Sequence, residues 1–154
     1  MQRVIVDAGP LIGWFNADDE YHALSRQYFD TFSGELLTTW PALGEVCALL
    51  PGRMVAPFLR WVAMGGVTVV DVPVSALAGL ADRMDRYAKL PMDLADATLI
   101  WLAESLSLLD IATVGQRDFA VYRTARGEAL RNVLFSPPPA RPKLTRAPAR
   151  RVKR

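Results

Sequence analysis

The sequence predicts an α/β fold with a central, mostly parallel sheet that helices cover on both faces. Two observations support this prediction. Short, continuously apolar runs recur along the chain, and such runs are typical of strands buried on both faces. One or two helix-like stretches separate successive runs, which is the pattern of βαβ units.

In the first part of the chain, strands are expected at residues 4–6 and 35–39, and helices at 11–15, 18–32 and 41–50. The first strand is the β-branched run Val4-Ile5-Val6, and Gly9-Pro10 then turns the chain into a helix. The acids at 18–20 suit the first turn of a helix because they stabilise its positive end. Pro41 suits the first position of the next helix.

Further along, strands are expected at residues 67–70, 111–114 and 132–135, and helices at 54–64, 74–89 and 93–105. Gly65-Gly66 is a typical end for the first of these helices. The runs Val67-Thr68-Val69-Val70 and Ile111-Ala112-Thr113-Val114 are rich in the β-branched residues that favour strands.

Composition excludes several function classes. The chain has 154 residues, 51% hydrophobic and 22% charged, which suits one globular domain. Cys47 and His22 are the only cysteine and histidine, which rules out an internal disulfide, a cysteine-based zinc site and a multi-histidine metal site. No apolar run approaches the ~20 residues of a membrane helix, and Asp7 interrupts the N-terminal run too early for a signal peptide. We therefore expect a cytoplasmic protein with no membrane partner.

Charge divides the chain into two parts. The formal net charge is +2, but residues 136–154 hold seven Lys and Arg and no acid, so residues 1–135 carry a net −5. We expect a folded domain over residues 1–135 and a disordered, basic, proline-rich tail over 136–154. Such a tail either binds nucleic acid electrostatically or is simply solvated, without a dedicated partner.

Four acids fall where a functional site is expected. Asp7 ends the first strand, Glu45 lies at the edge of an apolar helix stripe, and Asp96 lies in a helix that is apolar nearly all round. Asp118 follows the fourth strand. Open α/β folds place their sites at the carboxyl ends of the strands, so these acids are expected at one edge of the sheet.

The chemistry of these acids favours a divalent cation. A carboxylate in apolar surroundings is costly unless its charge is compensated, and residues 90–116 contain no Lys or Arg. Several carboxylates around one ion would supply that compensation. Oxygen ligands without histidine or cysteine select hard cations, so Mg²⁺ or Mn²⁺ is expected.

Each acid also has a purely structural explanation. Asp7 and Asp118 are equally well explained as caps of the turns that follow them, and Glu45 taken alone suits a solvated helix flank. Asp93 is best explained as the N-cap of its helix, whereas the apolar surroundings of Asp96 favour a functional role. The acids point to a site jointly rather than one by one.

At these residues the sequence resembles the PIN-domain family, and within it the VapC-type ribonuclease toxins of bacterial toxin–antitoxin pairs. The resemblance covers residues 3–135. The matching segments are Val4-Ile5-Val6-Asp7-Ala8-Gly9-Pro10-Leu11-Ile12, Thr39-Trp40-Pro41-Ala42-Leu43-Gly44-Glu45-Val46, Met92-Asp93-Leu94-Ala95-Asp96-Ala97, and Ile111-Ala112-Thr113-Val114 with Arg117-Asp118-Phe119.

The resemblance implies a PIN-like three-layer α/β/α sandwich, carboxylate-bound Mg²⁺ or Mn²⁺, and endonucleolytic cleavage of RNA. It also implies a homodimer and a cognate antitoxin protein. By position, Asp7, Glu45 and Asp96 match the metal-binding and catalytic acids. The fourth acid or Asn of the family corresponds to Gly115, so either Asp118 supplies that carboxylate or the site works with three.

Two other functions are alternatives to the endoribonuclease. A PIN-like module that lost turnover through Gly115 would bind RNA or an antitoxin without cleaving RNA. A haloacid-dehalogenase-like phosphatase also begins with an apolar strand that ends in Asp, but it needs a second Asp where this chain has Gly9. The endoribonuclease remains the leading hypothesis.

Overall fold

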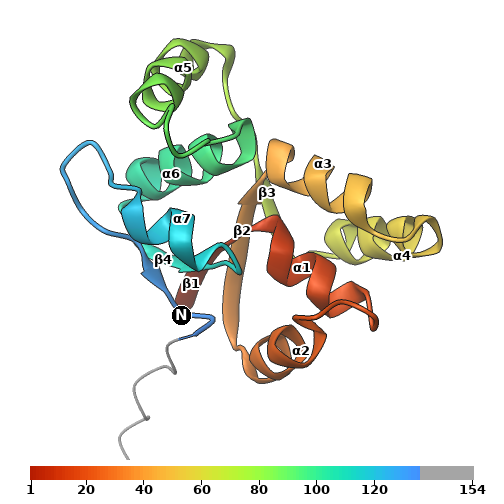
Figure 1. Cartoon of the computed structure of the whole chain (residues 1–154). Helices are drawn as coiled ribbons and strands as arrows, with labels where there is room; N and C mark the ends of the chain where they lie inside the picture. Colours follow the sequence, from red (N-terminus) through yellow and green to blue (C-terminus); the bar gives the residue numbers. More distant parts are fainter. Residues whose placement is uncertain (136–154) are drawn as a thin grey trace, which may run out of the picture.

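A five-stranded sheet forms the centre of the computed structural model, which describes residues 1–135 (Figure 1). The strands are β1 Gln2–Val6, β2 Gly34–Thr39, β3 Thr68–Val70, β4 Asp110–Ala112 and β5 Arg131–Asn132. Their order is β3-β2-β1-β4-β5, and every neighbouring pair is parallel. The predicted parallel α/β fold is therefore confirmed. The predicted tail, residues 136–154, lies outside the described residues.

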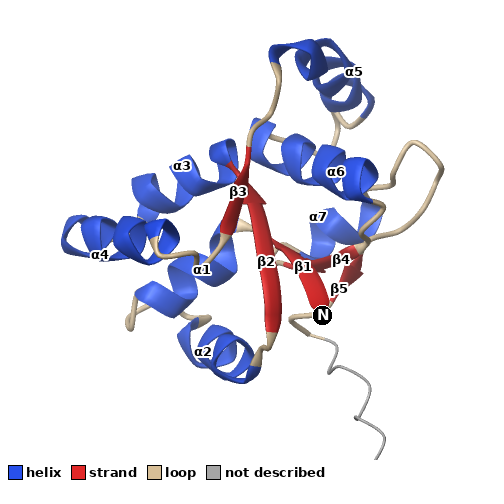
Figure 2. Cartoon of the chain, turned by 180° about the vertical axis from the view of Figure 1, so that it is seen from behind, coloured by secondary structure: helices blue, strands red, loops and turns tan. Residues whose placement is uncertain are grey.

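The helices cover both faces of the sheet (Figure 2). They are α1 Ala8–Phe15, α2 His22–Thr31, α3 Trp40–Leu49, α4 Gly52–Ala63, α5 Leu77–Arg86, α6 Leu94–Leu106 and α7 Gln116–Val121, with a 3₁₀ turn at Val74–Ala76. None of the helices formed by residues 1–135 is long and apolar enough to span a membrane.

The core consists of two apolar clusters, one on each face of the sheet. Val4 and Val6 of β1 pack on one face with α1, α2 and α4, while Ile5 between them packs on the other face with α5, α6 and α7. This alternation follows from the two-residue period of a strand. It produces the three-layer α/β/α sandwich that the resemblance implied. The helix α6 is apolar nearly all round because it contacts α3 and α5 as well as the sheet.

One helix begins later than its acidic residues predict. Asp18, Asp19 and Glu20 precede α2 instead of forming its first turn. The backbone N–H of Asp18 donates to the Asn16 side chain at 3.2 Å, and that of Tyr21 donates to the Asp19 side chain at 2.8 Å. These side-chain acceptors stabilise consecutive turns, which compete with helix in this segment.

Candidate functional site

The candidate site lies where the direction of the chain along the sheet reverses. From the central strand β1 the chain proceeds to β2 and β3 on one side, and then returns to β4 and β5 on the other. The carboxyl ends of β1 and β4 are neighbours, and the N–H of Asp7 donates to the Ala112 carbonyl oxygen at 3.0 Å. In open α/β sheets such a switch point is the usual position of a ligand site.

Asp7 is held from two sides at this point. One carboxylate oxygen accepts a hydrogen bond from the Ala8 N–H at 2.7 Å, so Asp7 does cap α1. The other accepts from the Thr113 hydroxyl at 2.8 Å, and Thr113 in turn accepts from the Gly115 N–H at 3.0 Å. The Asp7 carboxylate can still bind a cation besides accepting these two hydrogen bonds, because an ionised carboxylate offers about four lone-pair sites.

The N-terminal turn of α6 contributes two more acids. Asp93 is its N-cap, and one oxygen of its side chain accepts from the Asp96 N–H at 2.8 Å. This confirms the capping role that the sequence predicted for Asp93. Asp96 is half-buried, and its Oδ2 atom accepts from the Tyr122 hydroxyl at 3.2 Å.

Glu45 approaches from a third element. It lies in α3, which begins immediately after β2, and its side chain is half-buried. Burial, followed by the charges of Asp7 and Asp93, raises the pKa of Glu45 above its ordinary range. The structure therefore brings Glu45 within the electrostatic influence of the acids on α1 and α6.

Burial and mutual repulsion raise the pKa of the other acids as well. Burial raises the pKa of Asp7 and outweighs the hydrogen bonds from Thr113 and Ala8, which lower it, and the charge of Asp93 makes the smallest contribution to the rise. Burial, then the charges of Asp93 and Asp7, raises the pKa of Asp96 from 3.8 to about 7. Such shifts identify a cluster of like charges without enough compensation, which is typical of functional sites.

No arginine or lysine among residues 1–135 pairs with these acids. The ion pairs of this part of the chain lie elsewhere and join Arg3 to Glu35, Arg26 to Asp30, Arg83 to Glu104 and Arg131 to Asp110. The cluster at the switch point thus has the composition of a cation site. It contains several carboxylates, and within the described residues no positive side chain forms an ion pair with them.

Asp118 occupies a more peripheral position. It lies in the first turn of α7 and is half-buried. Its charge helps to raise the pKa of the Tyr122 phenol, after burial and Asp96. Asp118 is therefore near Tyr122, whose hydroxyl donates a hydrogen bond to Asp96.

The acids do not form a ready-made coordination shell. In the part of the chain that the structure describes, no three side chains of His, Cys, Asp or Glu are close enough together to hold one ion as they stand. The donor chemistry nevertheless suits Mg²⁺ or Mn²⁺, because every candidate ligand is a carboxylate oxygen. Binding would require side-chain rotation, for which Glu45 has the longest side chain of the set.

Gly115, where the family pattern expects an acid or Asn, leaves only tight space for a side chain. A Cβ atom there would lie 3.3 Å from the Thr113 hydroxyl oxygen and 3.6 Å from the Phe119 ring. Its φ of −78° is accessible to any residue. The backbone conformation therefore accepts other residues at this position, but a side chain requires the Thr113 hydroxyl to shift by a few tenths of an ångström.

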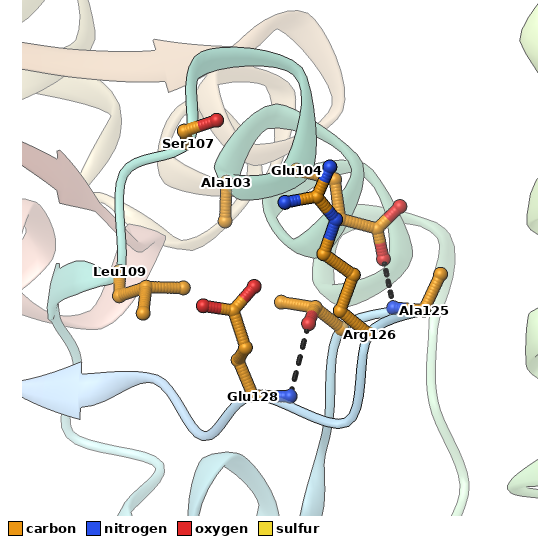
Figure 3. Close-up of a pocket in the computed structure, with 8 residues that line it drawn as sticks. Ala103, Glu104, Ser107, Leu109, Ala125, Arg126 and Glu128 are labelled. Atoms are coloured by element: carbon orange, nitrogen blue, oxygen red, sulfur yellow. Dashed lines mark hydrogen bonds between the residues drawn. The ribbon is translucent and has the colours of Figure 1, made fainter.

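A pocket of about 290 Å³ lies away from these acids, between the end of α6 and the loop that precedes β5 (Figure 3). Glu104 and Glu128 are among its lining residues. Glu104 accepts a hydrogen bond from the Ala125 N–H at 2.9 Å and pairs with Arg83, so its charge is already compensated. None of the four predicted site acids lines this pocket.

Sequence reasoning missed three polar residues that support the acids. Thr113 donates to Asp7, Tyr122 donates to Asp96, and the Asn132 side chain donates to the Thr113 carbonyl oxygen at 2.9 Å. For Thr113 a signal existed, since it directly follows a buried strand, as Asp7 does. Tyr122 lies in a segment whose path the sequence does not predict. Asn132 lies in the expected last strand, but the strand order that pairs this strand with β4 was not predicted.

Comparison with known proteins confirms the fold. No protein-family model matches the sequence, and no curated protein matches it. Among solved structures, the chain resembles that of VapC20 from Mycobacterium tuberculosis, described as a sarcin–ricin loop cleaving toxin, with a TM-score of 0.69 and 18% identity. The match covers 77% of this chain and 95% of VapC20. The chain therefore has the PIN-like fold of that toxin, as its sequence resemblance implied.

Proposed function

We propose that this protein is a divalent-metal-dependent endoribonuclease and the toxin of a toxin–antitoxin pair. The observation that carries this proposal is the gathering of Asp7, Glu45 and Asp96 at the switch point, without an ion pair to any basic residue in 1–135. The fold shared with a toxin that cleaves the sarcin–ricin loop supports RNA as the substrate.

Asp7, Glu45 and Asp96 would hold Mg²⁺ or Mn²⁺, with Asp118 as the fourth candidate ligand. Such an ion, when bound, activates water and stabilises the charge that develops on a phosphodiester during hydrolysis. Thr113 fixes one Asp7 oxygen, and Asp93 holds the first turn of α6 in place. These contacts fix the Asp7 carboxylate and the backbone from which the Asp96 side chain projects.

RNA binding requires positive charge that residues 1–135 do not have in excess. Their net −5 repels phosphates, so the acids must first be neutralised. Arg117 is exposed on α7, next to Asp118. We propose that Arg117, Arg123 and the seven basic residues of 136–154 contact the RNA backbone.

The remaining features follow from the resemblance. We propose that the protein acts in the cytoplasm as a homodimer, and that a cognate antitoxin protein binds it and blocks the site. Size-exclusion chromatography with light scattering tests the dimer. A small neighbouring reading frame for a DNA-binding antitoxin would supply the partner for a binding assay.

The test of the proposed activity is cleavage of total RNA by the purified chain with and without Mn²⁺. We expect cleavage only with the metal, and its loss in Asp7→Asn and Asp96→Asn. Asp82→Asn is the matched control, because Asp82 is an exposed acid on α5 and its replacement removes the same charge elsewhere. Equal cleavage by the control and by an Asp7→Asn, Asp96→Asn double variant would refute the proposal.

A second function, an RNA- or antitoxin-binding module with weakened catalysis, is favoured by two observations. Gly115 stands where the family expects a ligand, and residues 1–135 hold no ready-made group of three metal-binding side chains. Calorimetry separates the two functions. Millimolar Mn²⁺ that gives no binding heat, together with intact RNA binding, would favour the module over the enzyme.

A further inference from the structure

The Tyr122 side chain is buried completely, yet its hydroxyl is directed at the acidic site. Tyr122 follows α7 and has no exposed surface. Its hydroxyl donates to Oδ2 of Asp96 at 3.2 Å. We propose that Tyr122 is a positioning residue that fixes the Asp96 carboxylate for binding a divalent cation. This inference rests on the proposed function.

The Tyr122 ring is fixed by neighbouring aromatic residues. Phe119 and Tyr87 contact it edge to face, with ring centroids 5.2 and 5.1 Å away. Aromatic pairs of this geometry add roughly 0.5–1.5 kcal/mol beyond their burial and hold each other's orientation. The phenol therefore has one position from which to reach Asp96.

The backbone after Tyr122 is held from α5 and α6. The Arg123 N–H donates to the Tyr87 hydroxyl at 3.1 Å, and the Arg123 carbonyl oxygen accepts from the Arg83 guanidinium at 3.2 Å. Arg83 itself pairs with Glu104 of α6. These polar contacts hold the chain next to Tyr122 against α5 and α6, and none of them involves a site acid.

The hydrogen bond from Tyr122 constrains one of the two carboxylate oxygens of Asp96. Oδ2 accepts from the phenol, whereas no hydrogen bond within residues 1–135 reaches Oδ1. A carboxylate fixed in this way presents Oδ1 to an ion without first losing rotational freedom. Loss of such a supporting hydrogen bond typically weakens metal binding roughly 10–100-fold. At 3.2 Å the bond is long for O–H···O, so we expect the lower end of that range.

A tyrosine with a merely structural role would also lie in the core and satisfy its hydroxyl locally. The chain offers a control for the loss of a buried phenol oxygen by itself. The hydroxyl of Tyr28 is buried without a hydrogen-bond partner among the described residues, in α2. Tyr28→Phe removes the same atom from a buried position in α2, and it breaks no hydrogen bond within residues 1–135.

The experiment is isothermal titration of MnCl₂ into the full 154-residue chain, its Tyr122→Phe variant and its Tyr28→Phe variant. We expect Tyr122→Phe to weaken Mn²⁺ binding about tenfold, and Tyr28→Phe to leave it unchanged. At saturating Mn²⁺, RNA cleavage by Tyr122→Phe should recover most of its rate. Tyr87→Phe, which keeps the packing ring and loses the acceptor for Arg123, should weaken Mn²⁺ binding in the same direction but less.

The outcomes separate this inference from the proposed function. If the wild type binds Mn²⁺ and Tyr122→Phe binds it with the same affinity, the positioning role is wrong, whereas the metal site is supported. Absence of binding in the wild type would overturn the metal site, and the positioning role with it. Should Tyr122→Phe fail to fold, Tyr87→Phe decides, and its unchanged affinity for Mn²⁺ would overturn the inference.

Discussion

Replacement of Asp96 by asparagine is expected to stabilise the metal-free protein, and to do so more strongly as the pH rises. The folded state holds Asp96 half-buried, close to Asp93 and Asp7, and raises its pKa from 3.8 to about 7. The unfolded chain keeps the ordinary value. Ionisation of Asp96 therefore favours unfolding, and an uncharged asparagine removes that cost while it still accepts from Tyr122.

The size of the effect follows from the pKa shift. The rise from 3.8 to about 7 corresponds to roughly 4 kcal/mol at about 1.4 kcal/mol per unit. Asp96 is only half-buried, and solvent screening reduces this to about 2 kcal/mol. Because the folded pKa is the higher one, stability is lost as the pH rises from about 4 through about 7 and stays low above that.

The assay is thermal or urea unfolding in EDTA at pH 5 and pH 8. We expect Asp96→Asn to exceed the wild type by about 2 kcal/mol at pH 8, or roughly 6–10 °C in Tm, and by about half as much at pH 5. Asp82→Asn, on an exposed acid of α5, should change little at either pH. A pH-independent difference, or a less stable Asp96→Asn protein at pH 8, would refute the reasoning.

Three further substitutions test the site. Gly115→Asp adds a carboxylate beside Thr113, whose hydroxyl must shift slightly to accept it, and calorimetry should show tighter Mn²⁺ binding than in the wild type; weaker binding would contradict a cation site beside Thr113. Thr113→Val removes the hydroxyl that donates to Asp7 and should cost about 1–2 kcal/mol in urea unfolding and weaken Mn²⁺ binding roughly tenfold. Leu99→Ala, in the core of α6, should lower the free energy of unfolding by about 3 kcal/mol, with Mn²⁺ affinity unchanged where the protein stays folded.

The parallel strands were predictable from sequence because burial on both faces requires continuous apolar runs. The run Val4-Ile5-Val6 shows this most clearly, since its members pack on opposite faces of the sheet. Element boundaries were less predictable where side chains compete for the backbone. Asn16 and Asp19 hold turns before α2, so the acids at 18–20 do not begin the helix.

For the site, the sequence predicted which elements carry the acids, because the carboxyl ends of parallel strands meet at one edge. It also predicted the cap at Asp93 but not the contribution of that charge to the pKa of Asp7, Glu45 and Asp96. That contribution depends on the distance between α6 and its neighbours. The contact of Tyr122 with Asp96 depends on the path of the chain after α7, which no local pattern encodes.

The metal site itself is tested by anomalous diffraction from crystals of the full chain soaked in MnCl₂. We expect a Mn²⁺ peak within about 2 Å of carboxylate oxygens from both Asp7 and Asp96, with Glu45 rotated toward it. A peak that contacts only one of these residues, or none at the carboxyl ends of β1 and β4, would contradict the account.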